Sequence, residues 1–213
     1  MDFVPSLHLL AAFAVAGAVL AIIPGPDMAY FLGKTAEGGK RLGFAAMLGA
    51  STGLLVHSAL AALGLSALLA ASAEAFTVLK YAGAAYLLWL SYQAFRTGSK
   101  FTLANGRDSG TSLFRTYIGG LVINLMNPKI ILFFVTFLPQ FVDRGDVHAA
   151  AKLLFLGLFF ILIGGVIGGL IILAAHPFIR FLAGSRRGKR IFDYIFAGLM
   201  GTFAARLLLM EGH

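Results

Sequence analysis

Six long runs of apolar residues follow one another along the chain, separated by short polar connections. They lie at about 7–32, 42–70, 75–95, 114–141, 150–179 and 191–210. The stretch 153–179 contains no Asp, Glu, Lys or Arg, and it exceeds the roughly 18 apolar residues that indicate a membrane-spanning helix. Because backbone groups in lipid have no water to bind, each run must form a helix. The pattern therefore predicts an all-α, polytopic membrane protein with six transmembrane helices.

The composition agrees with a membrane setting and excludes several other classes of protein. Of the 213 residues, 59% are hydrophobic and 12% are charged, whereas a soluble domain carries about 25% charged residues. The mean hydropathy is +0.88. The net charge of +8 would suit nucleic acid, but the basic residues lie in short connections and form no common face. Membrane lipid is therefore the expected partner of the surface. The chain has no cysteine, which excludes disulfides and thiolate metal sites.

Lys and Arg residues are unevenly distributed between the connections. Twelve of the 17 follow the first, third and fifth runs, four lie on the opposite side, and Lys129 lies inside a run. Because cytoplasmic loops carry the excess of positive charge, this places those three connections in the cytoplasm and both termini outside it. Since all connections are short, we expect residues 1–213 to form one transmembrane domain. Its parts are a first half at about 7–95, a cytoplasmic loop at about 96–113 and a second half at about 114–210.

Prolines interrupt the first and the fourth run. The sequences at the two positions are Pro24-Gly25-Pro26-Asp27 and Asn127-Pro128-Lys129. Proline has no amide proton and clashes with the carbonyl four residues earlier, so the affected carbonyls are those of Leu20, Ile22 and Asn124. Proline also favours the first turn of a helix, and Gly or Asn is accepted at the position before it. A second half-helix is therefore expected to begin at each break, inside the membrane.

The two breaks occupy corresponding positions in the two halves of the chain. A shift of 102 residues places Pro26 on Pro128 and Asp27 on Lys129. Each break opens a group of three helices, and because three is odd, the two groups have opposite orientations. We therefore predict two inverted three-helix repeats with helices 1 and 4 broken, and a substrate site between the breaks. Half-helix N-termini suit a carboxylate and freed carbonyls suit an ammonium group, and an amino acid carries both.

Asp27 and Lys129 are charged residues well inside their runs. A charge at the centre of a membrane helix costs about 2.5–3.5 kcal/mol on insertion scales, so such groups face a cavity or pair with each other. In one interpretation Lys129 binds a substrate carboxylate, while Asp27 binds the substrate amine or a coupling proton. In the other, the two form a structural ion pair that closes the broken helices. The sequence leaves both open.

Four further polar residues are candidates for a supporting role near the breaks. His57 lies in the middle of the second run, where it is either a proton relay or, more commonly, a hydrogen-bonded packing residue. Helical spacing places Tyr30, Asn124 and Thr136 about one turn from the breaks, as candidates for lining a cavity.

These motifs resemble the lysine exporter (LysE/RhtB) family of amino-acid efflux carriers. The resemblance rests on residues 24–27 and 127–129, and extends to the stretches 81–88, 97–112 and 203–206. It implies secondary active export of amino acids across the inner membrane of bacteria, coupled to proton antiport, with no cofactor. The same resemblance puts the transport centre at Pro24, Gly25, Pro26, Asn127, Pro128 and Lys129. Members of the family often carry Asn at the position of Asp27, so the charge of the substrate and the coupling stay open.

Three alternatives to an amino-acid exporter differ in how well the sequence fits them. An enzyme is not expected, because the runs contain no nucleophile with a neighbouring base and no cluster of metal ligands. An exporter of cations or other small solutes fits the same pattern of breaks. A membrane scaffold without transport activity would leave the paired, charged breaks unexplained. A homodimer also stays open, although small residues at helix-packing spacing are better explained by contacts within one subunit: Gly49 with Gly53, Gly164 with Gly168 and Gly165 with Gly169.

Overall fold

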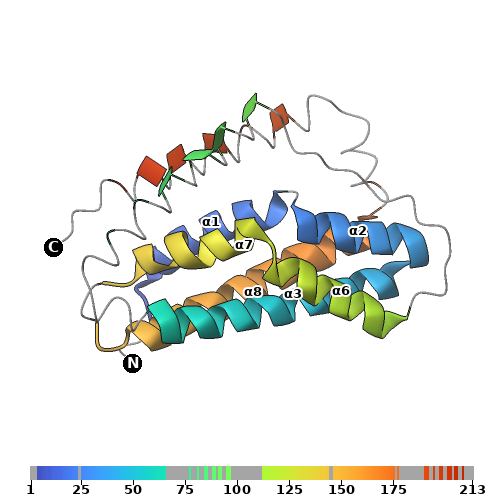
Figure 1. Cartoon of the computed structure of the whole chain (residues 1–213), viewed down its shortest axis with the longest axis horizontal. Helices are drawn as coiled ribbons and strands as arrows, with labels where there is room; N and C mark the ends of the chain where they lie inside the picture. The colour runs from blue at the N-terminus through green and yellow to red at the C-terminus, as the bar shows by residue number, and fades with distance from the viewer. Residues whose placement is uncertain are drawn as a thin grey trace.

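The described residues form a bundle of helices. The computed structural model describes residues 4–23, 25–65, 112–143 and 146–175, together with separate positions between 77 and 96 and between 177 and 208. Within this part there are no strands, in agreement with the predicted all-α class. The helices run along a common long axis (Figure 1). They are α1 (Leu7–Ile22), α2 (Pro26–Gly38), α3 (Lys40–Leu60), η1 (Ala61–Leu65), α6 (Leu113–Leu125), α7 (Pro128–Leu132), η2 (Phe133–Phe137), η3 (Leu138–Phe141) and α8 (Ala149–Leu173).

Up to four membrane spans can be recognised among the described residues. The helices Lys40–Leu65 and Ala149–Leu173 are each long and apolar enough to cross a bilayer. Two bent helix pairs qualify when each is taken as one span: α1 with α2, bent by 52°, and α6 with α7–η3, bent by 49°. The predicted spans at 75–95 and 191–210 and the loop at 96–113 lie largely outside the described residues. The separate positions there include a hydrogen bond of 2.7 Å from Ser91 Oγ to the carbonyl of Ala197.

The first two spans are joined by one residue instead of the expected polar connection. Helix α2 ends at Gly38 and α3 begins at Lys40, and Gly39 between them has a φ of +80°, which favours glycine. Lys34, which was expected in this connection, lies inside α2 and forms an ion pair of 2.6 Å with Glu37. The apolar run marks only the part of the helix in lipid. Polar residues that pair with each other continue the helix beyond it.

The fourth span continues beyond its break as a sequence of unlike helices. After one turn of α-helix in α7, the chain forms the π-helix η2 and then the 3₁₀-helix η3, which contains Pro139. Thr136 and Gln140 donate to the carbonyls of Leu132 and Thr136, at 2.7 and 3.0 Å, and so compensate part of the irregular backbone. The apolar pattern predicted a helix here, but it did not predict the change of helix type, because each type lasts only four or five residues, too few for its period to show in the sequence.

Two close contacts fix the position of the second break in the bundle. On one side α6 packs against α3 through glycines, as a Cβ added to Gly49 would lie 1.9 Å from the carbonyl oxygen of Tyr117. One added to Gly120 would lie 2.1 Å from the carbonyl oxygen of Ala46. On the other side the phenylalanines of η2 and η3 surround the buried ring of Phe13 on α1, at centroid distances of 5.1 to 6.0 Å. The α6–α7 junction is thus held between α1 and α3.

Candidate functional site

The two helix breaks begin new helices at the predicted residues. Helix α2 starts at Pro26 with Gly25 as its N-cap, and no side chain caps it. Helix α7 starts at Pro128 with Asn127 as its N-cap, and the Asn127 side chain accepts a hydrogen bond of 3.0 Å from the amide of Lys129. Pro24 lies outside the described residues. Local rules for helix termini therefore located both half-helix starts correctly.

Polar groups at each break bind groups at the other break. Asp27 Oδ2 accepts hydrogen bonds of 2.9 Å from the side-chain amides of Asn124 and Asn127, which flank the second break. In the opposite direction, Lys129 Nζ donates to the carbonyls of Leu20 and Ile23 before the first break, at 3.3 and 3.0 Å. The two breaks thus form a single reciprocal unit, although about 100 residues of sequence separate them.

Other donors replace the backbone amides that the prolines lack. The carbonyls of Leu20 and Asn124 were predicted to lose their partners, and both now accept hydrogen bonds. Leu20 accepts from Lys129 Nζ. The backbone carbonyl of Asn124 accepts a hydrogen bond of 3.0 Å from the backbone amide of Asn127, and it lies 3.5 Å from His57 Nε2. Because an unpaired carbonyl in an apolar setting is costly, these contacts stabilise the broken helices.

Asp27 and Lys129 do not contact each other directly. The ion pairs that lie wholly within the described ranges join Lys34 to Glu37 and Lys152 to Asp146. Each of the two intramembrane charges instead binds uncharged groups of the opposite break. The sequence left open a direct structural ion pair and a substrate site. The structure shows a third arrangement, in which each charged side chain stabilises the break of the other span through uncharged groups.

A cavity of about 70 Å³ lies at the junction of the breaks. Asp27, Asn124 and Lys129 line it together with apolar side chains from α1, α2, α3 and α8. Asp27 Oδ1 and Asn124 Oδ1 are buried and have no hydrogen-bond partner among the described residues. Since buried polar atoms are normally paired, two free acceptors beside one cavity indicate a site for a hydrogen-bond donor.

Two glycines allow the polar side chains to approach the neighbouring helices. A Cβ added to Gly25 would lie 3.0 Å from Lys129 Nζ, and one added to Gly53 would lie 2.4 Å from Asn124 Oδ1. Gly25 was predicted at the site, whereas Gly53 on α3 was recognised only as a residue with helix-packing spacing. Its contact with Asn124 depends on how α3 and α6 pack, which no local sequence pattern reveals.

The remaining predicted residues lie near the breaks but do not line this cavity. The His57 ring stacks on Phe134 with centroids 5.5 Å apart. Tyr30 Oη donates to the Thr116 carbonyl at 3.3 Å, and Thr136 donates within its own span. The sequence missed the apolar lining residues, including Met47 and Gly164, because their spacing resembles that of ordinary core positions.

The chain matches known proteins over most of its length. Residues 18–211 match the family described as LysE type translocator. The chain is 36% identical to an uncharacterized membrane protein of Bacillus subtilis, YrhP, over 67% of this chain and 72% of the relative. It is 34% identical to the homoserine/homoserine lactone efflux protein of Salmonella typhimurium, over 62% and 63% of the two chains. It is 30% identical to the leucine efflux protein of an Enterobacter species, over 92% of both.

No solved structure matches the chain. The family match, by contrast, extends from the first helix, through both breaks, almost to the C-terminus, so it includes every residue that lines the cavity. The chain therefore belongs to the LysE type translocator family, as its motifs indicated.

Proposed function

We propose that this protein exports amino acids from the bacterial cytoplasm across the inner membrane. The observation that carries the proposal is the cavity between the two helix breaks, where a carboxylate, an ammonium group and one free amide oxygen lie on residues of a mainly apolar lining. Relatives that match over much of the chain are named as efflux proteins for leucine and for homoserine or its lactone. The site offers partners for both charged groups of an amino acid.

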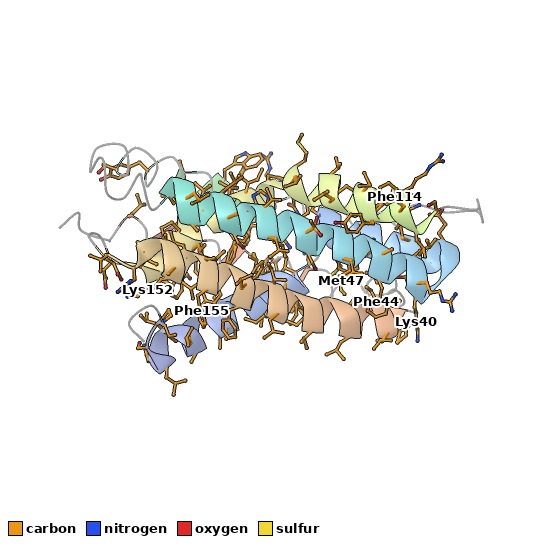
Figure 2. The ribbon with its side chains drawn as sticks, turned by 90° about the horizontal axis from the view of Figure 1, so that it is seen from below. Lys40, Phe44, Met47, Phe114, Lys152 and Phe155 are labelled. Carbon is orange, nitrogen blue, oxygen red and sulfur yellow. The ribbon has the colours of Figure 1, made fainter. Side chains whose placement is uncertain are left out.

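The directions of the broken helices support an arrangement of inverted repeats. Lys40 and Phe114 lie at one end of the bundle and Lys152 at the other (Figure 2). The α1–α2 pair ends next to Lys40, whereas the α6–α7 pair begins next to Phe114, so the two broken spans run in opposite directions. With the excess of Lys and Arg in the cytoplasm, the Lys40 end is cytoplasmic and both termini lie outside.

The substrate amine is proposed to bind at the first break. Asp27 Oδ1 and Asn124 Oδ1 are buried acceptors without partners among the described residues, and an ammonium group supplies donors for both. Asp27 keeps its orientation through Oδ2, which the two asparagine amides hold. A bound ammonium group therefore needs no rearrangement of the carboxylate.

The substrate carboxylate is proposed to bind Lys129. In the structure Lys129 Nζ donates to two neutral backbone carbonyls, whereas a carboxylate forms the stronger, charge-assisted hydrogen bond. The N-terminus of α2, which no side chain caps, adds backbone amides and the positive end of a helix dipole. Releasing the Leu20 and Ile23 carbonyls would loosen the brace between the breaks, and this couples substrate binding to movement of the two halves.

Proton antiport follows from alternate occupation of Asp27. The carboxylate binds either the substrate ammonium group or a proton, so release of the substrate on the outer side allows a proton from that same side to bind Asp27 and to be carried inward. His57 is proposed to be a packing residue, because its ring stacks on Phe134 and lies outside the cavity lining.

Counterflow in proteoliposomes loaded with a mixed amino-acid panel, with and without a pH gradient, tests the proposal. We expect selective exchange of one or a few amino acids, enhanced by the gradient and reduced in Lys129→Ala. Folded wild-type protein that exchanges no amino acid would contradict it. That outcome would favour export of a cation, for which the free oxygens of Asp27 and Asn124 are also suitable partners.

A further inference from the structure

Few polar side chains line the cavity. Asp27, Asn124 and Lys129 lie at the breaks, and Ser51 is the only other polar side chain among the described residues that line the cavity. The larger apolar side chains of the lining are those of Leu20, Phe31, Met47, Leu54, Ile130 and Phe160. A ligand held by its charged groups at the breaks therefore directs its remainder toward apolar surface.

We infer that the substrates are amino acids with uncharged, mainly apolar side chains, and that Gly164 of α8 limits their size. The inference rests on the proposed function and adds its substrate class. Asp27 and Lys129 are the only charged residues among the described ones that line the cavity, so none of these remains to pair with a second charge on the substrate. Because an unpaired charge is costly in such a setting, basic and acidic amino acids are rejected.

Gly164 is the open position on the α8 wall of the cavity. It lines the cavity between Phe160 and Gly168, each one helical turn away. A Cβ added to Gly164 would meet no atom of a described residue within 4 Å, whereas one added to Gly168 would lie 3.0 Å from Met47 Sδ. Figure 2 shows Met47 on α3, at the side of α3 that faces α8. A side chain at position 164 would extend into space that the substrate needs, without displacing any described residue.

The small volume of the cavity makes this position decisive. In a space of about 70 Å³, a few added carbon atoms occupy a large share of the volume. Met47 and Met28 also line the cavity, and flexible thioether side chains adjust to ligands of different shape. Met28 on α2 and Met47 on α3 thus form an adjustable wall of the cavity, while Gly164 on α8 sets the limit on substrate size.

The neighbouring Gly165 provides a matched control. A Cβ added there would also meet no atom of a described residue within 4 Å, but Gly165 does not line the cavity. Substitution of either glycine raises the helix propensity of α8 by the same amount. Differences between the two variants therefore report the cavity and not the stability of the helix.

The inference is tested by counterflow with an equimolar panel of alanine, valine, leucine, phenylalanine, lysine and glutamate. The proteins compared are wild type, Gly164→Ala, Gly164→Leu and Gly165→Leu. We expect wild type to exchange uncharged members and neither lysine nor glutamate. Gly164→Leu should lower the ratio of leucine to alanine exchange by about tenfold or more, since excluding a methylene group from an apolar pocket changes selectivity by that order. Gly164→Ala should lower it less, and Gly165→Leu should leave it unchanged.

The outcomes separate this inference from the proposed function. Exchange of amino acids with an unchanged leucine-to-alanine ratio in folded Gly164→Leu would overturn the role of Gly164 and leave the exporter intact. Wild-type exchange of lysine or glutamate in preference to uncharged members would overturn the substrate class alone. Absence of all exchange by folded wild type would overturn both. Monodisperse elution in detergent at wild-type yield establishes that Gly164→Leu is folded.

Discussion

The two helix breaks are nearly equal in geometry and opposite in chemistry. They bend their spans by 52° and 49°, and each begins a new helix with proline at its first position. The second break is closed by its own side chain, since Asn127 caps α7. The first break has no such cap, and its carboxylate oxygen Asp27 Oδ1 has no partner among the described residues. We therefore propose that the second break contributes mainly as the brace, and the first as the more open half of the proposed binding site.

The largest effect on transport is expected from the first break. Asp27→Asn keeps the size of the side chain but removes the charge that holds a substrate ammonium group. Because hydrogen bonds to charged groups contribute about 1.5–3 kcal/mol, exchange should fall by roughly 10- to 100-fold. Counterflow, normalised to the amount of inserted protein, measures the change. Loss of insertion together with transport would instead assign Asp27 a structural role.

The second break is expected to have the larger effect on stability. Lys129→Ala leaves the carbonyls of Leu20 and Ile23 without their donor, and each buried unpaired group costs about 1–3 kcal/mol. The melting temperature in detergent should therefore fall further in Lys129→Ala than in Asp27→Asn. Equal melting temperatures in the two variants would remove the distinction between brace and binding site.

A glycine next to the second break should show an intermediate effect. In Gly53→Ala the added Cβ would lie 2.4 Å from Asn124 Oδ1, so Asn124 must move and its hydrogen bond to Asp27 must weaken. Overpacking of this kind costs about 1–3 kcal/mol. We expect slower counterflow and a lower melting temperature. Gly169→Ala, where the nearest atom is 3.7 Å away, is the matched control and should behave as wild type.

A smaller effect is expected from His57. As a packing residue stacked on Phe134, it should tolerate Gln with only a few-fold loss of exchange, and the pH dependence of flux should keep its midpoint. A midpoint that disappears or moves by a full pH unit in His57→Gln would show that the ring titrates during the cycle.

The smallest effect is expected far from both breaks, at the start of α8. Asp146 accepts hydrogen bonds from Lys152 and from the amide of His148, and these contacts hold the pKa of its carboxyl below the usual value. A carboxyl whose pKa is lowered on folding stabilises the folded protein at any pH above its unfolded pKa of about 3.9. That contribution is lost as the pH falls through the pKa of the folded state. Because the ion pair is partly exposed to solvent, this contribution is small, and Asp146→Asn should lower the melting temperature only slightly between about pH 5 and 8. A clear decrease would show that this turn supports the bundle.

Local sequence rules predicted the breaks but not the connections between them. Apolar runs and the positions of Pro26 and Pro128 were sufficient to locate the broken spans and their helix starts, because proline acts on its own backbone. The binding of Lys129 to the Leu20 carbonyl and the approach of Gly53 to Asn124 could not be predicted, since both depend on how distant helices pack. The same holds for the apolar cavity wall at Gly164. The six-helix inverted arrangement stays a prediction, because two of its spans lie largely outside the described residues.

The central claim is that the substrate amine binds Asp27 between the breaks. Thermal unfolding of the purified protein tests it most directly, with a transported amino acid and its N-acetyl derivative added separately to wild type and to Asp27→Asn. A ligand that binds only the folded state raises the melting temperature. We predict that the amino acid stabilises wild type and not Asp27→Asn, and that the N-acetyl derivative stabilises neither. Equal stabilisation of both proteins by the amino acid would contradict the claim.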